Sequence, residues 1–299
     1  MKNKHRKFSR IKWIKSRKPL RDDFFSPEFS LDQGEILAGP PEARGSYNFL
    51  GYFPPGTIDR YLKNRGVYQM LEKRGFSDLI LTVDTQNSYR QRLAIHCASV
   101  APQNLLVEVV LKRQYHRLKS PFPTPAADRN FEFLAVEWLC LQNPREEFSS
   151  DHPRLPGQSF PGLGMGKLAL DLIAEAAKRM RLAGILNVPE YFHNAQIYSR
   201  RMNYLDPVCE GKRMALARDL LGKLSLAELS WAIDRNCVQE NHKPFTWFTT
   251  PQIFPIDPLL TDYLNADAYR KLASEAGEAV HYRLRPRKWK KVRPTLPLI

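Results

Sequence analysis

Apolar residues in the first half of the chain cluster into four short segments separated by polar or proline-containing turns. These segments are rich in residues that favour β-strands. They are Leu79–Val83, Leu93–Ser99, Leu105–Leu111 and Phe131–Leu141. The longest connection between them is a proline-containing loop over residues 117–129. Because short loops join antiparallel neighbours, the pattern predicts an antiparallel meander.

A helical period appears on both sides of the predicted strands. Residues 57–74 place apolar side chains at a spacing close to that of an α-helix. After the strands, Lys167–Arg181 carries one apolar face and is closed by Gly184. The next segments, Ile185–Val188 and Glu190–Arg200, predict a short strand and a further helix. A strand followed by a loop, a helix and a strand is a βαβ crossover, so we expect parallel pairing beside the meander.

The last third of the chain predicts mainly helices. The candidates are Lys212–Leu221, Leu226–Val238 and Pro258–Ala276. Asp257 is placed to cap the last of them. We therefore expect a basic arm over residues 1–21, a folded domain over 22–210 and a helical extension over 211–299. The predicted class is α/β, or α+β, with a mixed sheet.

The net charge of +15 looks at first like that of a nucleic-acid-binding protein. Residues 1–21 hold ten Lys or Arg and residues 279–299 hold seven, with no acidic residue in either segment. Of the 46 basic residues, 29 remain between the two segments, against 31 acidic ones. The body is therefore nearly neutral. Basic segments of this kind are commonly solvated and disordered, and weak, salt-sensitive RNA contact is the alternative.

Other features narrow the class of protein. The four cysteines are far apart, so neither a disulfide framework nor a cysteine-based zinc site is expected. The seven histidines are scattered, and no metal site is predicted. The chain has no apolar run long enough for a membrane span, and its first residues lack the apolar core of a secretory signal. These features predict a cytoplasmic protein.

Alternate glycines lie between the last predicted meander strand and the helix that follows it. In the segment Pro161–Gly166, such glycines let the backbone turn tightly and bring N–H groups near a ligand. The following helix start adds a partial positive charge, which suits a pyrophosphate, whereas a simple flexible turn is the alternative. A Rossmann site would follow the first strand of a βαβ unit, and a P-loop would need a different spacing. The order of elements excludes the Rossmann site, and the residues around Lys167 exclude the P-loop.

This order and these residues resemble the GNAT superfamily of acyl-CoA N-acyltransferases. The resemblance rests on Gln158, the glycine series, the amphipathic helix, the short strand and the segment His193–Tyr198, and covers roughly residues 77–206. It implies a GNAT-like mixed sheet that binds acetyl-CoA or another acyl-CoA. It also implies that Tyr198 protonates the leaving thiolate. The CoA-binding residues that it implies are Gln158, Gly162, Leu163, Gly164, Met165, Gly166 and Asn194.

The transfer of an acyl group to an amine also needs a base. Strict alternation along Phe131–Leu141 would place Glu137 on an otherwise apolar face, where desolvation would raise its pKa. An edge glutamate that reaches solvent is the alternative. Glu190 and His193 are further candidates for the base, although the first suits a helix start and the second a surface position.

The sequence thus predicts an N-acyltransferase that moves an acetyl or acyl group from acyl-CoA to an amine by direct attack. The alternative is a non-catalytic protein that binds RNA or the ribosome through its basic tails. The acceptor amine and the acyl chain length are not specified by these patterns.

Overall fold

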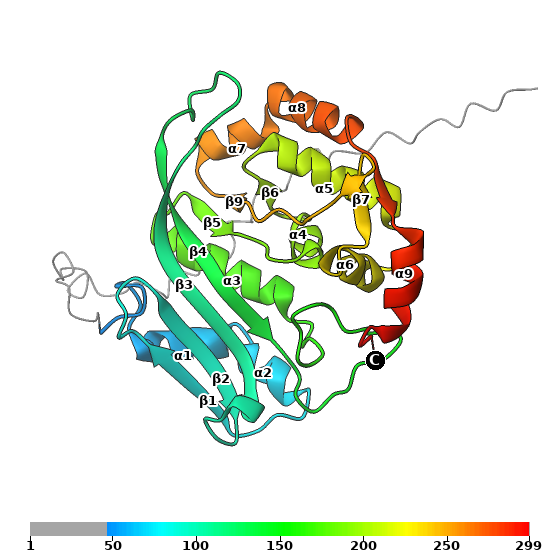
Figure 1. The fold of residues 1–299 in the computed structure, drawn as a ribbon. Helices are drawn as coiled ribbons and strands as arrows, with labels where there is room; N and C mark the ends of the chain where they lie inside the picture. Colours follow the sequence, from blue (N-terminus) through cyan, green and yellow to red (C-terminus); the bar gives the residue numbers. More distant parts are fainter. Residues whose placement is uncertain (1–46, 299) are drawn as a thin grey trace, which may run out of the picture. The chain divides into compact units, whose positions relative to one another are not determined.

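The computed structural model describes residues 47–298, which belong to one compact unit over Ala43–Ile299. The expected basic arm over residues 1–21 lies outside the described residues. A seven-stranded mixed sheet in the order β1-β2-β3-β4-β5-β9-β6 forms the centre of this unit (Figure 1). A second sheet has three strands in the order β10-β7-β8.

The strands of the larger sheet are β1 Leu79–Asp84, β2 Gln91–Cys97, β3 Leu105–Arg117, β4 Asn130–Leu141, β5 Gly184–Asn187, β6 Asn203–Tyr204 and β9 Gln252–Pro255. Those of the smaller sheet are β7 Val238–Glu240, β8 Lys243–Pro244 and β10 Tyr282–Leu284. Strands β1 to β4 pair antiparallel, and β4 pairs parallel with β5. The predicted meander and crossover are both present, and the chain is a mixed α+β protein.

The helices are α1 Pro55–Asn64, α2 Val67–Glu72, α3 Gly166–Arg179, α4 Phe192–Tyr198, α5 Pro207–Leu220, α6 Leu226–Asp234, α7 Pro258–Asn265, α8 Asp267–Glu278 and α9 Pro286–Val292. Two of the predicted helices are each divided in two. The first divides into α1 and α2, and the last into α7 and α8. The predicted N-cap Asp257 is confirmed, since its side chain accepts a hydrogen bond of 2.8 Å from Leu259 N.

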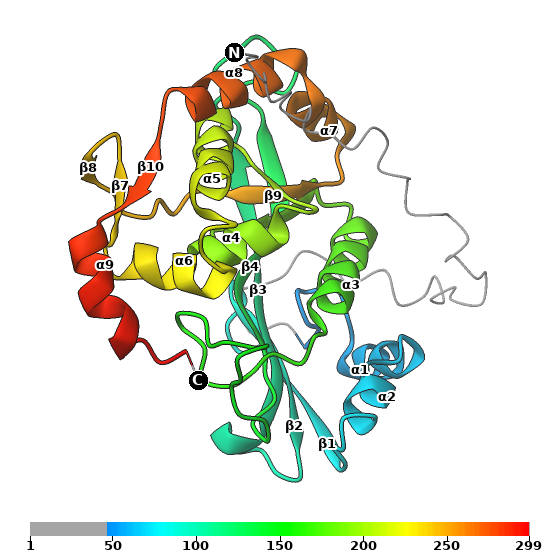
Figure 2. The same ribbon diagram turned by 90° about the vertical axis from the view of Figure 1, so that its right-hand side faces the viewer.

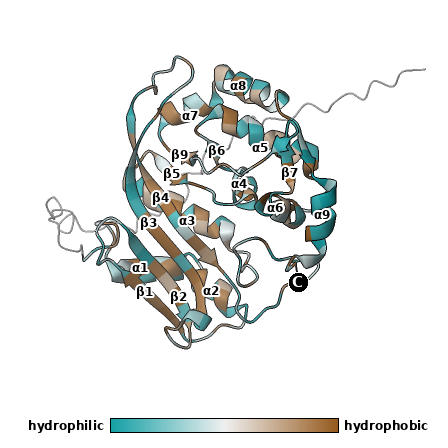
Figure 3. Cartoon of the chain, in the orientation of Figure 1, coloured by the Kyte–Doolittle hydropathy of each residue, from teal (hydrophilic) through white to brown (hydrophobic). Residues whose placement is uncertain are grey.

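Helices cover both faces of the larger sheet (Figure 2). On one face, α1, α2 and α3 pack against β1–β4 in a core that includes Leu71, Ile95 and Ile173. On the other face, Phe133 and Ile253 pack against α7 and α8. Brown, apolar residues follow the strands beneath α1 and α3, and teal, polar residues follow α9 (Figure 3). No helix within residues 47–298 combines the length and apolar character that a membrane span requires.

The C-terminal third is joined to the rest of the fold through the larger sheet. Strand β9 pairs antiparallel with β5 on one side and with β6 on the other. Helix α5 runs through the expected division between residues 210 and 211. The division itself stays a prediction, but the expected helical extension supplies a strand to the larger sheet as well as helices.

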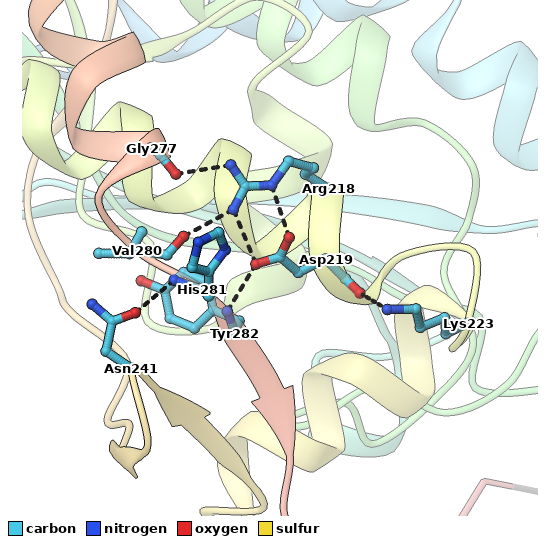
Figure 4. A network of polar contacts seen from close by, with 8 residues as sticks. All are labelled: Arg218, Asp219, Lys223, Asn241, Gly277, Val280, His281 and Tyr282. Atoms are coloured by element: carbon cyan, nitrogen blue, oxygen red, sulfur yellow. Dashed lines mark hydrogen bonds and ion pairs between the residues drawn. The ribbon is translucent and has the colours of Figure 1, made fainter. Parts of the chain in front are cut away.

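The C-terminal basic segment is folded, and the expectation that it is disordered was wrong for its described part. Tyr282 and Trp289 are only 2% and 8% exposed, and they pack with α5 and α6 in one core. Arg218 of α5 donates to Gly277 O at 2.9 Å and to Val280 O at 2.8 Å (Figure 4). These contacts tie the end of α8 and the link before β10 to α5, and Tyr282 N of β10 donates to Asp219 of α5 at 2.8 Å. The buried aromatic side chains explain why a strongly charged segment is ordered.

Candidate functional site

Strand β4 is longer than its parallel neighbour β5. The two pair only where Phe133–Val136 faces Gly184–Asn187, so residues 137–141 continue beside β3 with no strand pairing on the β5 side. A cavity of about 270 Å³ lies beside this part of β4. Its walls include β4, the segment 156–160, the end of β5 and helix α4. The cavity therefore lies at the carboxyl ends of two parallel strands, where α/β proteins commonly bind ligands.

A β-bulge in β4 determines which side chains face this cavity. Val110 of β3 pairs with Trp138 of β4, but the next β3 residue, Leu111, pairs with Val136. Glu137 is thus the extra residue, and the alternation of the strand reverses there. Before the bulge, odd-numbered residues such as Phe133 face the core beside α7 and α8. After it, Leu139 faces the core beneath α3.

The cavity brings together four of the nine residues predicted as catalytic or CoA-binding, besides the two alternatives for the base, Glu190 and His193. These four are Glu137, Gln158, Asn194 and Tyr198. Gln158 also holds the segment that carries it, because its Oε1 accepts from Leu155 N at 3.1 Å and its own carbonyl accepts from Arg154 at 2.7 Å. The other five residues, 162–166, do not line the cavity but continue from its wall into α3.

Residues 162–166 alternate between exposed glycines and buried side chains. Gly162, Gly164 and Gly166 are exposed, whereas Leu163 and Met165 are 2% and 3% exposed and anchor the segment in the core. Gly164 has a φ of +66°, a conformation that favours glycine. The backbone N–H groups of residues 164–168 donate to no other residue in the described range. Five adjacent donors therefore remain available at the start of α3.

The charges around this helix start favour an anion. The first turn of α3 contains no acidic residue, and Lys167 is exposed there. The exposed guanidinium of Arg74 lies beside Gly164, since a Cβ at that glycine would be 3.6 Å from Arg74 Nη2. Arg74 forms no ion pair with any residue from 47 to 298. The acid one turn further on, Asp171, is paired with Arg201.

The prediction that Glu137 is a desolvated base is not supported by its contacts. Its carboxylate forms ion pairs with Arg90 at 2.7 Å and Lys112 at 2.6 Å. The expected apolar face does not extend to Glu137, because the bulge interrupts the alternation on which that expectation depended. Each of its two carboxylate oxygens is thus held by a cation. Glu137 therefore lines the cavity as an ion-paired group.

Tyr198 is the last residue of α4 and is partly buried against the core of the larger sheet. Its hydroxyl forms no hydrogen bond with any other described residue, although its side chain lines the cavity. Burial raises the pKa of Tyr198 above its ordinary value. The hydroxyl is therefore protonated at neutral pH, and a proton donor in the cavity is available.

His193 was expected on the surface, and this expectation was wrong. It is 3% exposed, lines the cavity and stacks on Tyr191 with the ring centroids 5.5 Å apart. Its Nδ1 is buried and has no hydrogen-bond partner among residues 47–298, and burial lowers the pKa of His193 to about 4. The imidazole is therefore neutral at pH 7. The other expected alternative for the base, Glu190, also lines the cavity.

Several lining residues were not singled out in the sequence. Tyr191 packs closely against the backbone of Gly157, where an added Cβ would lie 2.9 Å from its ring. Asn187 ends β5, and the half-buried thiol of Cys140, whose pKa burial raises to about 11, lies after the bulge in β4. The position of residues 187–193 directly after a parallel strand was the available signal.

Comparison with known proteins adds little to this geometry. No protein-family model matches the chain, and no curated protein matches it. Among solved structures, a chain of the KacTA–DNA complex aligns with 47% of this chain and 69% of its own length, at 12% identity and a TM-score of 0.24. A likeness at that TM-score carries no argument about fold or function.

Proposed function

We propose that the protein is an N-acyltransferase with a GNAT-like core, which transfers an acyl group from acyl-CoA to an amine. The observation that carries the proposal is the cavity beside residues 137–141 of β4. Four residues that the resemblance and the strand pattern single out line this one cavity, and the glycine segment leads from its wall into α3. A ligand with an anionic end and a reactive thioester end fits such an arrangement.

The start of α3 is the proposed site for the CoA pyrophosphate. The N–H groups of residues 164–168, which have no acceptor in the described part of the chain, and the helix dipole both favour an anion. Arg74 and Lys167 are the nearby cations, and the first turn has no competing carboxylate. The pantetheine arm would then extend from this helix start into the cavity beside β4.

In the proposed reaction, the amine nitrogen attacks the thioester carbonyl carbon. A C–N bond forms, the C–S bond breaks, the amine loses a proton and the CoA sulfur gains one, so the products are an amide and free CoA. We assign the proton donor for the sulfur to Tyr198. We assign the proton acceptor to the imidazole of His193, which lines the cavity, in place of Glu137, whose two carboxylate oxygens are each held by a cation.

The proposal is tested by calorimetric titration of acetyl-CoA and free CoA into the full chain. We expect a Kd in the micromolar range and a loss of at least about 100-fold in affinity in Gly166→Asp. The new carboxylate would accept the N–H groups at the helix start and repel the pyrophosphate. An acid there suits a helix start and should leave the helix intact.

The matched control is Gly56→Asp. Gly56 also lies in the first turn of a helix, α1, which has no acidic residue there, and a Cβ at either glycine meets open space. This variant should bind CoA like the unmodified chain. No binding of either ligand at millimolar concentration, or an unchanged Kd in Gly166→Asp, would contradict the proposed function.

A second candidate function, RNA binding, is favoured by the surface of α9. Arg287, Lys290 and Lys291 are exposed there and form no ion pair with any residue in the described part of the chain. Triple replacement of these residues by Gln should lower RNA affinity and its salt dependence, measured by fluorescence anisotropy at two salt concentrations. If affinity and salt slope are unchanged, α9 does not contact RNA.

A further inference from the structure

A second cavity, of about 140 Å³, lies against the core between α1, α3 and the sheet and is partly open. Its walls come from these two helices and from β2, β3 and β4, and its lining is almost entirely aliphatic and aromatic. Representative lining residues are Phe53, Ile58, Ile95, Val109, Leu172 and Ile173. Few polar side chains line this cavity, and they belong to Thr57, Tyr61 and Arg179.

This apolar cavity adjoins the polar cavity of the proposed acyl-CoA site. Leu139 and Leu141 line both of them. These two leucines follow the bulge at Glu137, in the part of β4 that has no β5 neighbour. Met165, from the glycine segment, also lines the apolar cavity. The apolar space therefore borders the place where the proposed thioester would lie.

An apolar cavity of this size is unusual because protein interiors are close-packed. A water molecule in such a cavity would lack the two to four hydrogen-bond partners that stabilise buried water. Apolar cavities of similar size accept small apolar molecules instead. An apolar cavity of about 150 Å³ accepts benzene, which has six carbon atoms, so 140 Å³ suits a chain of about five or six carbon atoms. The natural occupant of such a space is a hydrocarbon chain.

We propose that the apolar cavity binds the acyl chain of a medium-chain acyl-CoA. The enzyme would then prefer acyl groups of about six to eight carbons over acetyl groups. This inference rests on the proposed function. The carbonyl carbon and its neighbour would remain in the polar cavity, and the following carbons would pass Leu139 and Leu141. Each methylene buried in the apolar cavity should then tighten binding about four-fold until the cavity is full.

The test is calorimetric titration of the full chain with acyl-CoAs of two, four, six, eight and twelve carbons. Affinity should rise about four-fold per methylene from butanoyl to about octanoyl and then level off. The variant Ala176→Leu fills the cavity on α3, ten residues and about 15 Å from Gly166. It should weaken octanoyl-CoA at least about ten-fold and leave acetyl-CoA unchanged.

The matched control is Ala276→Leu, the same exchange at a half-exposed position of α8 that lines neither cavity. It should keep the full preference for chain length. Folding of both variants is checked by thermal unfolding, and Ala176→Gly, which enlarges the cavity, should retain octanoyl-CoA binding if Ala176→Leu fails to fold.

Two results would overturn this inference in different ways. If acetyl-CoA binds and affinity does not change with chain length, the acyl-chain site is wrong and the proposed transferase stands. If no acyl-CoA binds, the proposed transferase function and the acyl-chain site are both wrong. Titration with octanoate alone then shows whether the cavity binds a hydrocarbon chain without CoA, and Ala176→Leu should abolish that binding.

Discussion

The two cavities on β4 share Leu139 and Leu141 but differ in every other respect. One is lined by ionisable and amide side chains from β4, α4 and the segment before the glycines. The other is lined by aliphatic and aromatic side chains from α1, α3 and the sheet. The bulge at Glu137 allows this, because it turns the later leucines toward the apolar core while the edge of the strand stays open. One extra residue thus lets a single strand border two chemical environments.

Among the variants proposed here, the largest effect is expected on kcat, from a substitution in the polar cavity. Tyr198→Phe removes the proposed proton donor and should lower kcat about 100-fold, or about 2.7 kcal/mol in the barrier, with the CoA Kd unchanged. Tyr191→Phe, which removes a hydroxyl from the same cavity, should change kcat less than three-fold. Equal losses in both variants, measured by steady-state kinetics, would remove the proton-donor assignment.

The next largest effect is expected on the free energy of unfolding, from substitutions of leucines that line the cavities. Leu141→Ala should lower the free energy of unfolding by about 2 kcal/mol, since Leu141 is only partly buried. Leu172→Ala, which borders the apolar cavity alone, should lose a similar amount in urea denaturation. Only Leu141→Ala should also alter the Kd for acetyl-CoA. If Leu172→Ala changes that Kd as much, the two cavities are not separated by β4.

The burial of His193 should make stability depend on pH. Its pKa of about 4 in the folded protein is below the ordinary value of 6.5, so the unfolded chain binds a proton first as pH falls. Stability is therefore present above pH 6.5 and is lost as pH falls toward 4. Between pH 7 and pH 5 this loss is about 2 kcal/mol.

Urea denaturation at the two pH values measures this difference. His193→Gln should lose about 2 kcal/mol less than the unmodified chain between pH 7 and pH 5. The exposed His152 provides the control, and His152→Gln should behave like the unmodified chain. Identical pH dependence in the unmodified chain and His193→Gln would mean that His193 titrates normally.

The smallest effect should come from Glu137, although it lines the same cavity as Tyr198. Glu137→Gln should change kcat less than three-fold, because Arg90 and Lys112 already hold the carboxylate. The pH profile of kcat/KM, measured in parallel, should keep its shape. A loss of 100-fold would restore Glu137 as the base and would place His193 in a positioning role.

Local patterns were sufficient for most of the meander and for the helix after it. Strand β4 and helix α3 have 12 and 14 residues, and their ends lie within two residues of prediction. Strand β3 runs to Arg117, beyond its predicted end at Leu111. The bulge could not be predicted, because it depends on how β4 aligns with β3, and the sequence of β4 alone fits strict alternation. The role expected for Glu137 depended on that alternation.

The missed elements depend on contacts between distant residues. Strand β9 has four residues, ends in Pro255 and lacks a local signal of its own. In the C-terminal segment, seven cations obscured the apolar residues Tyr282 and Trp289, whose burial requires α5 and α6. For His193, burial results from the stacking of Tyr191 and the packing of α4 against α6, which no local pattern indicates.

Strand β9 lies between β5 and β6 in the sheet but follows both in the sequence. Gln252 pairs with Asn187, which comes 65 residues earlier. During synthesis, β5 emerges long before this partner, and its unpaired edge can meet other chains. Pairing between such distant residues is also slow to form. The nascent chain should therefore be most prone to aggregation after residue 187 has left the ribosome and before residue 255 has followed it.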